Sequence, residues 1–420
     1  MRSEPGTGAA AASAPGSTGA ADARPSARRA ALVLAVLLGV QPVTTDLMLP
    51  AMPLLGRQLG ASMAAVQLTM SAMILAFGVA QLVWGPLADR WGRRPVLLGG
   101  LGLYVLAAAG AALATSAIQV VAWRALQGAA LAVPVVCARA SLRDLYAPAE
   151  GALVMARAMS GLGLIAICSP PVAGVLVSVF GWRASLWAMA AAGAGAWALI
   201  AWHWPETRQA ANPGAAASPP LATQAGRILR HPVFLTWTAL VTCSYGGLFV
   251  FLSGSGHVLI RVLGIPPAQA GLVMSTSSLA YIAGTLVCRR WLLRHGLVGS
   301  VLRGSGFTLA AAVLLGLQAW SDARSVWSVM APVWLYALGH GVHQPCAQAG
   351  SVGPFPHAAG AASALAGFVL AAGAFGTGLW LGTALDDTTR ALALGMSLAA
   401  ACALGVIWGA VRRLREPWHG

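Results

Sequence analysis

The sequence predicts an all-α membrane protein with about twelve spanning helices, and three observations support that class. The chain is 58% hydrophobic and only 9% charged, which is far more apolar than a soluble domain. Apolar stretches of roughly 20 residues, the length of a membrane-spanning helix, recur along almost the whole sequence. The alternating pattern of an outer-membrane barrel is absent from it, so helices are the expected spanning elements.

The apolar stretches fall into two groups of six. In the first group the predicted spans are 30–53, 65–88, 95–115, 118–142, 152–178 and 184–204. In the second group they are 232–254, 269–288, 297–319, 325–349, 358–383 and 391–411. The boundary between the tenth and eleventh spans is placed at Gly353-Pro354-Phe355-Pro356, because two prolines end a helix there.

Polar segments divide the chain into domains. Residues 1–28 are rich in Ala, Gly, Ser and Pro and cannot bury a core, which predicts a disordered cytoplasmic tail. The long polar interval at 205–230 predicts a cytoplasmic linker. The expected domains are therefore the tail 1–28, an N-terminal six-helix bundle 29–204, the linker 205–230, a C-terminal six-helix bundle 231–413, and a cytoplasmic tail 414–420.

The net charge of +15 reports topology rather than nucleic-acid binding, because the arginines gather in short loops beside apolar spans. With the amino end in the cytoplasm, most loop arginines fall on that side, and only five fall on the other: Arg57, Arg183, Arg261, Arg324 and Arg390. This asymmetry predicts that both termini are cytoplasmic in a bacterial inner-membrane protein. The chain has no lysine, which disfavours a P-loop ATPase and a retinal protein, since both need one.

The most informative motif is Gly85-Pro86-Leu87-Ala88-Asp89-Arg90-Trp91-Gly92-Arg93-Arg94. It concentrates charges in a tight turn between the second and third spans, so it must lie at a water interface. Gly92 is expected to permit the sharp reversal, and Gly85 to let another helix approach closely. Part of the motif returns after the eighth span as Gly284-x-Leu286-x-x-Arg289, with Cys288 in the place of Asp89.

The turn resembles the signature loop of the major facilitator superfamily. Further segments resemble the Bcr/CflA branch of twelve-span drug:proton antiporters, whose members confer bicyclomycin and chloramphenicol-type resistance. These segments include Thr45-Asp46, Leu49-Pro50-Ala51-Met52-Pro53, Arg139-Ala140, Arg143-Asp144-Leu145-Tyr146 and Gly181-Trp182-Arg183. The resemblance implies the major facilitator fold, twelve helices in two six-helix bundles around a central cavity. The branch usually has an aromatic residue where this chain has Met48.

Two charges inside predicted spans are candidates for proton coupling. Asp46 lies in the first span, where an acid costs about 2.5–3.5 kcal/mol on insertion scales and therefore needs a function. Arg124 lies in the fourth span, and the resemblance makes it a partner in coupling. For Asp46 the alternative is a capping or pairing role near the outer end of the span. For Arg124 it is a structural brace between the first and fourth spans.

The resemblance also assigns a gate to the charged turn, with Gly85, Asp89, Arg90, Gly92 and Arg93 as its residues. Asp89 would cap a helix of the other half when the protein faces outward, and breaking that contact would open the cytoplasmic side. The alternative is a solvated loop charge.

Candidate residues of the substrate cavity come from three spans, and for several of them a different role is also compatible with the sequence. His340 and His343 lie three residues apart in the tenth span, followed by Gln344; the spacing allows a metal site, a titratable cavity wall or packed imidazoles. No further ligand set accompanies them, so no metal is predicted. Tyr245 and Phe249 form an aromatic stripe on the seventh span, which either lines the cavity or packs against other helices or lipid. The candidates are Gln127, Tyr245, Phe249, His340, His343 and Gln344.

These patterns predict a transporter and not an enzyme, with no cofactor, because no nucleophile–base set or sensing domain is visible. The expected function is proton-coupled export of an apolar or amphipathic drug by alternating access. The alternative is a carrier of the same fold for a sugar, an amino acid or another metabolite. The expected partners are the substrate, protons and the lipid bilayer, with no nucleic acid, and the family default is a monomer.

Overall fold

The computed structural model describes residues 25–208 and 221–414. Most of the tail predicted at 1–28, the centre of the linker predicted at 205–230 and nearly all of the tail at 414–420 lie outside the described residues. The described part of the linker contains a short helix, α8 (Leu221–Ile228).

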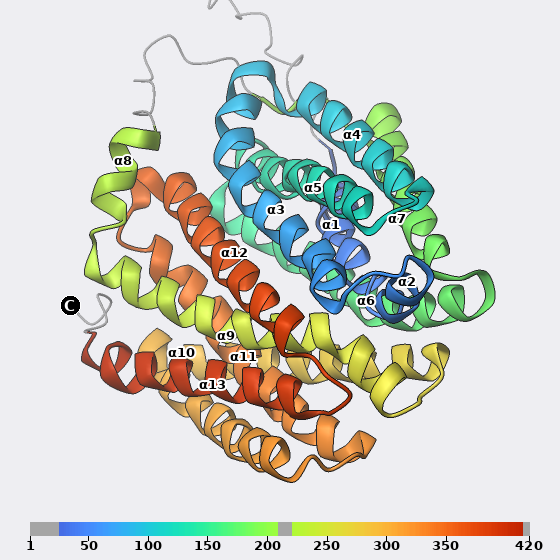
Figure 1. The fold of residues 1–420 in the computed structure, drawn as a ribbon. Helices are drawn as coiled ribbons and strands as arrows, with labels where there is room; N and C mark the ends of the chain where they lie inside the picture. Colours follow the sequence, from blue (N-terminus) through green and yellow to red (C-terminus); the bar gives the residue numbers. More distant parts are fainter. Residues whose placement is uncertain (1–24, 209–220, 415–420) are drawn as a thin grey trace, which may run out of the picture.

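Helices make up both halves of the molecule, and Figure 1 shows the blue-to-green first half and the yellow-to-red second half as two groups lying against each other. The first half, which precedes the linker helix α8, contains α1 (Ala27–Asp46), α2 (Met52–Gln58), α3 (Met63–Trp91), α4 (Arg93–Leu113), α5 (Ala117–Leu145), α6 (Pro148–Phe180) and α7 (Trp182–His203). Those of the second half are α9 (Pro232–Gly256), η1 (His257–Val262), α10 (Pro267–Ser321), α11 (Val326–Val352), η2 (Pro356–Ala358), α12 (Ala359–Ala384), α13 (Arg390–Gly409) and η3 (Val411–Arg413).

These helices give twelve membrane crossings. Ten helices in the described residues are long and apolar enough to span a bilayer. One of the ten, α10, has 55 residues and breaks at Gly296, where φ is 64°. At about 1.5 Å per residue it is far longer than a bilayer is thick, so its two segments cross separately. The helix α11, with 27 residues, gives the twelfth crossing although its polar side chains lower its hydropathy.

The first predicted span, 30–53, is wrong at its carboxyl end. The helix α1 starts at Ala27 and ends at Asp46, a buried turn follows, and the short α2 begins at Met52. Pro50 and Pro53 account for the break, because proline disfavours helical geometry in the residue before it and offers no backbone donor. Asp46 therefore occupies the last turn of a helix rather than its middle.

The two halves meet along two pairs of helices. The helix α3 packs against α12, as Figure 1 also shows, and α6 packs against the first segment of α10. We call the end of the bundle with the Gly92 turn the hinge end and the opposite end, with the turn between α1 and α2, the α1–α2 end. Within the first half, α1 packs against α6 and also contacts α5, which places the predicted coupling residues Asp46 and Arg124 on neighbouring helices.

Candidate functional site: the charged turn and the buried polar clusters

A buried arginine organises the charged turn. Gly92, with φ 97°, separates α3 from α4 and confirms the predicted reversal, since only glycine tolerates that conformation well. Arg93 then bonds two carboxylates: its Nη1 lies 2.5 Å from Asp89 Oδ1 and its Nε lies 3.0 Å from Asp144 Oδ2. Only 8% of its side chain is exposed. Both acids are needed to compensate a charge that is so largely removed from water.

Glu206 closes the same turn from the start of the linker. Its carboxylate accepts hydrogen bonds from the backbone amides of Arg93 and Arg94 at 2.9 and 3.1 Å, and from that of Arg208 at 2.8 Å. It thus caps the amino end of α4, where a negative charge is favourable. Burial by itself would raise the pKa of this carboxyl, but the backbone amides hold that pKa below its ordinary value.

We expect Glu206→Gln to lower the stability of the purified protein by about 1 kcal/mol at neutral pH, the usual size of a charged helix cap. Because the folded-state pKa lies below the ordinary value of 4.5, the carboxylate contributes its full stabilisation above that pH. The contribution is lost as the pH falls through the folded pKa. Thermal unfolding in detergent should therefore show a gap between wild type and variant that closes in acid. A gap of equal size at every pH would contradict this assignment.

Of the other predicted gate residues, Gly85 is not in close contact with another helix, and Arg90 and Asp89 are exposed. The expectation that Gly85 lets another helix approach closely is wrong in this conformation, because a Cβ there would meet nothing within 4 Å. Arg90 is exposed, and its carbonyl accepts a hydrogen bond from Arg208 Nη1 at 2.7 Å. The side chain of Asp89 is 67% exposed. It forms an ion pair with Arg93 of its own half, so in this conformation the acid points to the turn and to water.

The second copy of the motif keeps an arginine, Arg289, in the place of Arg90 but has no acid. Gly284 packs against the backbone of Leu338 in α11, where a Cβ would overlap the carbonyl oxygen. Cys288, in the place of Asp89, is buried with its Sγ 3.5 Å from that of Cys346. The repeat is therefore a packed helix contact in the second half and an ionic centre in the first.

Arg124 is fully buried in a cluster of neutral groups. Its Nη2 donates to the carbonyl of Thr44 at 3.1 Å, and its Nη1 donates to Gln127 Oε1 at 2.7 Å. The sulfurs of Met70 and Met189 complete its surroundings. The hydroxyl of Thr44 in turn lies 2.7 Å from that of Tyr104. Gln127, predicted to line the cavity, is thus sealed inside the first half as a partner of Arg124.

Asp46 lies two residues beyond the carbonyl that Arg124 binds. Only 7% of this residue is exposed, and its carboxyl accepts a hydrogen bond from the Thr45 hydroxyl at 2.7 Å. Tyr245 of α9, in the second half, lies within electrostatic range of the carboxylate. The structure therefore places Asp46 close to the carbonyl that Arg124 binds, but no ion pair joins these two residues.

Opposite Asp46, the second half presents an aromatic and polar cluster. The ring of His340 lies 6.3 Å from that of Tyr245 and 5.7 Å from that of Tyr281. Its Nδ1 lies 2.8 Å from the hydroxyl of Ser244. Tyr281 donates to Gln344 Oε1 at 2.7 Å. Tyr245, His340 and Gln344 are thus brought together, whereas Ser244 and Tyr281 were missed in the sequence because neither belongs to a motif.

Two further cavity candidates, His343 and Phe249, lie between packed helices, and the ring of Phe249 is 6.3 Å from that of Tyr245. His343 is fully buried and faces the second segment of α10, where a Cβ at Gly304 would lie 3.2 Å from its Nε2. Phe249 is also buried, and a Cβ at Gly378 of α12 would lie 3.0 Å from its ring. Both side chains pack between helices, which is the alternative to a cavity-lining role that the sequence allows for each of them.

Contacts between the halves are tight at the α1–α2 end. Gln67 Nε2 of α3 donates to the carbonyl of Ser253 in α9 at 2.9 Å. A Cβ at Gly256 would overlap the carbonyl oxygen of Leu49, and one at Gly271 would overlap that of Pro170. Such backbone-to-backbone approach leaves no passage between these elements. At the hinge end, a Cβ at Gly85 would meet nothing within 4 Å and Asp89 is exposed, so no such backbone approach occurs around these two residues.

The model of the Major Facilitator Superfamily matches residues 34–378. The chain belongs to the major facilitator superfamily. A chloramphenicol resistance protein of Pseudomonas aeruginosa is 32% identical over 322 residues, which are 76% of this chain and 75% of that protein. Multidrug resistance protein D of Escherichia coli is 29% identical and a bicyclomycin resistance protein homolog of Haemophilus influenzae 28%, over 80% of this chain and 84% and 85% of theirs.

Solved structures agree with the major facilitator fold. A bacterial homolog of the human lysosomal transporter Spinster, in an inward-facing and occupied conformation, superposes with a TM-score of 0.70 at 13% identity, covering 92% of this chain and 98% of that one. A D-xylose-proton symporter gives 0.67 at 14% identity, covering 90% and 96%. The predicted fold and the Bcr/CflA resemblance are confirmed, and this member of the major facilitator superfamily is a multi-pass membrane carrier rather than an enzyme.

Proposed function

We propose that this chain is a proton-coupled exporter of apolar or amphipathic drug-like compounds in a bacterial inner membrane. The names of its relatives support the drug substrate, since they refer to chloramphenicol, multiple drugs and bicyclomycin. The observation that carries proton coupling is Asp46, a nearly buried acid close to Tyr245 of the opposite half. An acid at the interface of two rocking bundles can bind and release a proton as its access changes.

Arg124 completes this mechanism as a positioning residue. Its guanidinium holds the Thr44 carbonyl in the last turn of α1, so a shift of α1 against α5 would move the backbone next to Asp46. The proton gradient supplies the work: about 2.3 kcal/mol per charge for each 100 mV and about 1.4 kcal/mol per pH unit.

The proposed topology places the hinge end and both termini in the cytoplasm, in agreement with the arginine asymmetry. The tight contacts at the α1–α2 end then correspond to a state closed to the outside. We further propose 29–204 and 231–413 as the two moving bodies, joined by the linker 205–230, in a transporter that works as a monomer. The cluster of Tyr245, Tyr281, His340 and Gln344 is the proposed substrate-facing wall of the second body.

Drug susceptibility of cells with and without the transporter, followed by proton release from energised vesicles on drug addition, tests this function. Lower susceptibility together with drug-dependent proton movement is the expected result. Movement of a sugar, an amino acid or another metabolite in place of any drug would favour the alternative carrier, and drug export without proton movement would refute the coupling.

The gate gives a separate prediction. Asp89→Asn is expected to reduce drug export about tenfold or more, because the neutral side chain can neither form an ion pair with Arg93 nor place a negative charge at the positive end of a helix of the other half during the cycle. Membrane insertion should be unaffected, since Asp89 is largely exposed. Efflux assays with expression measured by immunoblot check both points. The matched control is Asp387→Asn, an exposed acid paired with Arg261 at the α1–α2 end, and normal export by the Asp89 variant would refute the gate.

A further inference from the structure

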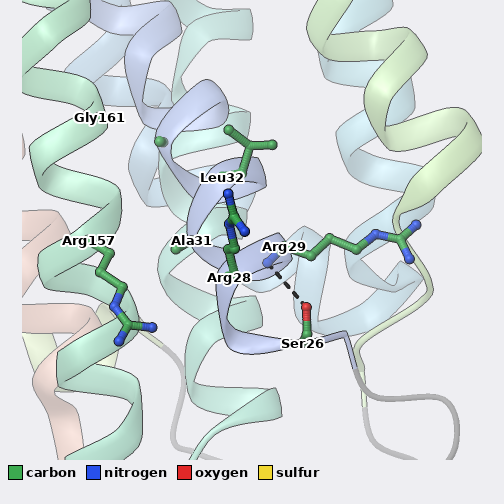
Figure 2. Close-up of a pocket in the computed structure, with 8 residues that line it drawn as sticks. Ser26, Arg28, Arg29, Ala31, Leu32, Arg157 and Gly161 are labelled. Atoms are coloured by element: carbon green, nitrogen blue, oxygen red, sulfur yellow. Dashed lines mark hydrogen bonds between the residues drawn. The ribbon is translucent and has the colours of Figure 1, made fainter.

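A groove of about 510 Å³ lies at the hinge end between the start of α1 and the helix α6. Ser26, Arg28 and Leu32 line it from α1 and its cap, and Arg157 and Gly161 line it from α6. Figure 2 shows Arg157 extending from α6 toward the start of α1, while Arg29 extends the other way. The proposed transport cycle uses none of these side chains.

The groove opens on the outer surface of the bundle. Large apolar side chains are exposed along the whole of α6 at helical spacing, at Leu153, Leu164, Val172, Val175 and Val179. This stripe continues to the α1–α2 end, where α6 is packed against α10, so it faces lipid and not the space between the halves. Arg157 follows Leu153 by four residues and precedes Leu164 by seven, which places it on the same stripe.

The depth of Arg157 fits a phospholipid phosphate. The helix α6 has 33 residues, or about 50 Å at about 1.5 Å per residue, which exceeds the hydrocarbon core of about 30 Å. Arg157, nine residues from the hinge end of α6 at Pro148, therefore lies toward the headgroup end of the helix. Arg28 occupies the first turn of α1 at the same end. Both side chains are exposed, and no hydrogen bond or ion pair joins either to another residue within 25–208 and 221–414. Arg29, in contrast, is engaged through Nη2 with the carbonyl of His203 at 2.8 Å.

We propose that this groove binds an anionic phospholipid. Its phosphate would lie between Arg28 and Arg157, beside the amino end of α1, where backbone amides favour negative charge. One acyl chain would run along Leu32, which is 62% exposed. Gly161 forms the floor of the groove, because a Cβ there would lie 2.7 Å from that of Ala35. A cation on a lipid-facing stripe, next to an apolar surface, selects a lipid rather than a free anion.

Native mass spectrometry of the delipidated full-length protein tests this site, with dioleoylphosphatidylglycerol as the probe and dioleoylphosphatidylcholine and inorganic phosphate as comparisons. Phosphatidylglycerol should bind, and neither comparison should bind or compete. Each arginine removed should weaken binding about fivefold, and Arg28→Gln with Arg157→Gln roughly thirtyfold. Arg157→Lys should retain most of the affinity, because the charge remains, and Arg290→Gln, an exposed arginine at the hinge end of the second half, should retain all of it.

Equal phosphatidylglycerol binding by the double variant and by Arg290→Gln would overturn the proposal. Full competition by inorganic phosphate would also overturn it, since the groove would then be a site for a soluble anion. Unfolding temperatures of all variants without lipid, which we expect to be unchanged for these exposed positions, separate lost binding from lost folding.

Discussion

Asp46→Asn is expected to abolish uphill drug export, reducing it to the level of cells that lack the transporter. Asparagine has nearly the same shape and can keep the hydrogen bond from Thr45, so helix α1 and its packing should persist. The amide cannot release a proton, and the free energy of the gradient, about 1.4 kcal/mol per pH unit, then has no path to the substrate. Drug accumulation in energised vesicles, with pH recorded in the same sample, measures both sides of the coupling.

The matched control is again Asp387→Asn, an acid at the same end of the molecule whose side chain is 79% exposed. Its export and proton movement should equal those of the wild type. The Asp46 variant should still exchange labelled drug down its gradient, because that process needs no net proton transfer. Uphill export by the Asp46 variant with normal proton movement would refute the coupling role and leave the fold unaffected.

The second large effect is expected for Arg124→Met. Methionine is apolar and would sit against Met70 and Met189. Removing the buried charge offsets the cost of leaving the Thr44 carbonyl and Gln127 Oε1 without their donor, so the unfolding temperature of the purified variant should stay close to that of the wild type. Export should nevertheless fall by about tenfold or more, because an intramembrane charge is retained for function rather than stability and the contact with the Thr44 carbonyl is lost.

Arg183→Met separates this role from that of a brace. Arg183 also binds carbonyl oxygens, those of Ala112 and Ala114 at 3.1 Å, but it is only partly buried and both partners belong to the first half. Its loss should lower the unfolding temperature and leave the export of each folded molecule intact. If Arg124→Met behaves in the same way, Arg124 is a structural brace and takes no part in coupling.

The charged turn could be predicted only in part. Gly92, Asp89 and Arg93 fall within five residues, and their local chemistry indicates a tight turn at a water interface. The other members of the centre are remote in sequence: Asp144 lies 51 residues from Arg93, and Glu206 lies 113 residues away. No pattern along the chain records that α5 and the linker return to this point, so the capping of α4 and the second carboxylate became visible only in three dimensions.

The predicted cavity residues show the same limit. Helical spacing in the tenth span places His340 and His343 near each other, but the structure turns His340 toward Tyr245 and His343 toward α10. Gln127 belongs to a motif together with Arg124, and the hydrogen bond between them hides it inside the first half. A three-residue separation rotates a side chain by about 60° around the helix, enough to move it from one neighbouring helix to the next.

The sequence alone determined the class of the protein, the number and order of its spans, the sharp turn at Gly92 and the family, because these depend on composition, length and local backbone preference. Tertiary structure decided the rest: the split of α10 at Gly296, the pairing of Arg93 with two acids, the separation of Asp46 from Arg124 and the lipid-facing groove at Arg157. Periodicity along a helix tells which residues share a face, but only the packing of distant helices decides what that face meets.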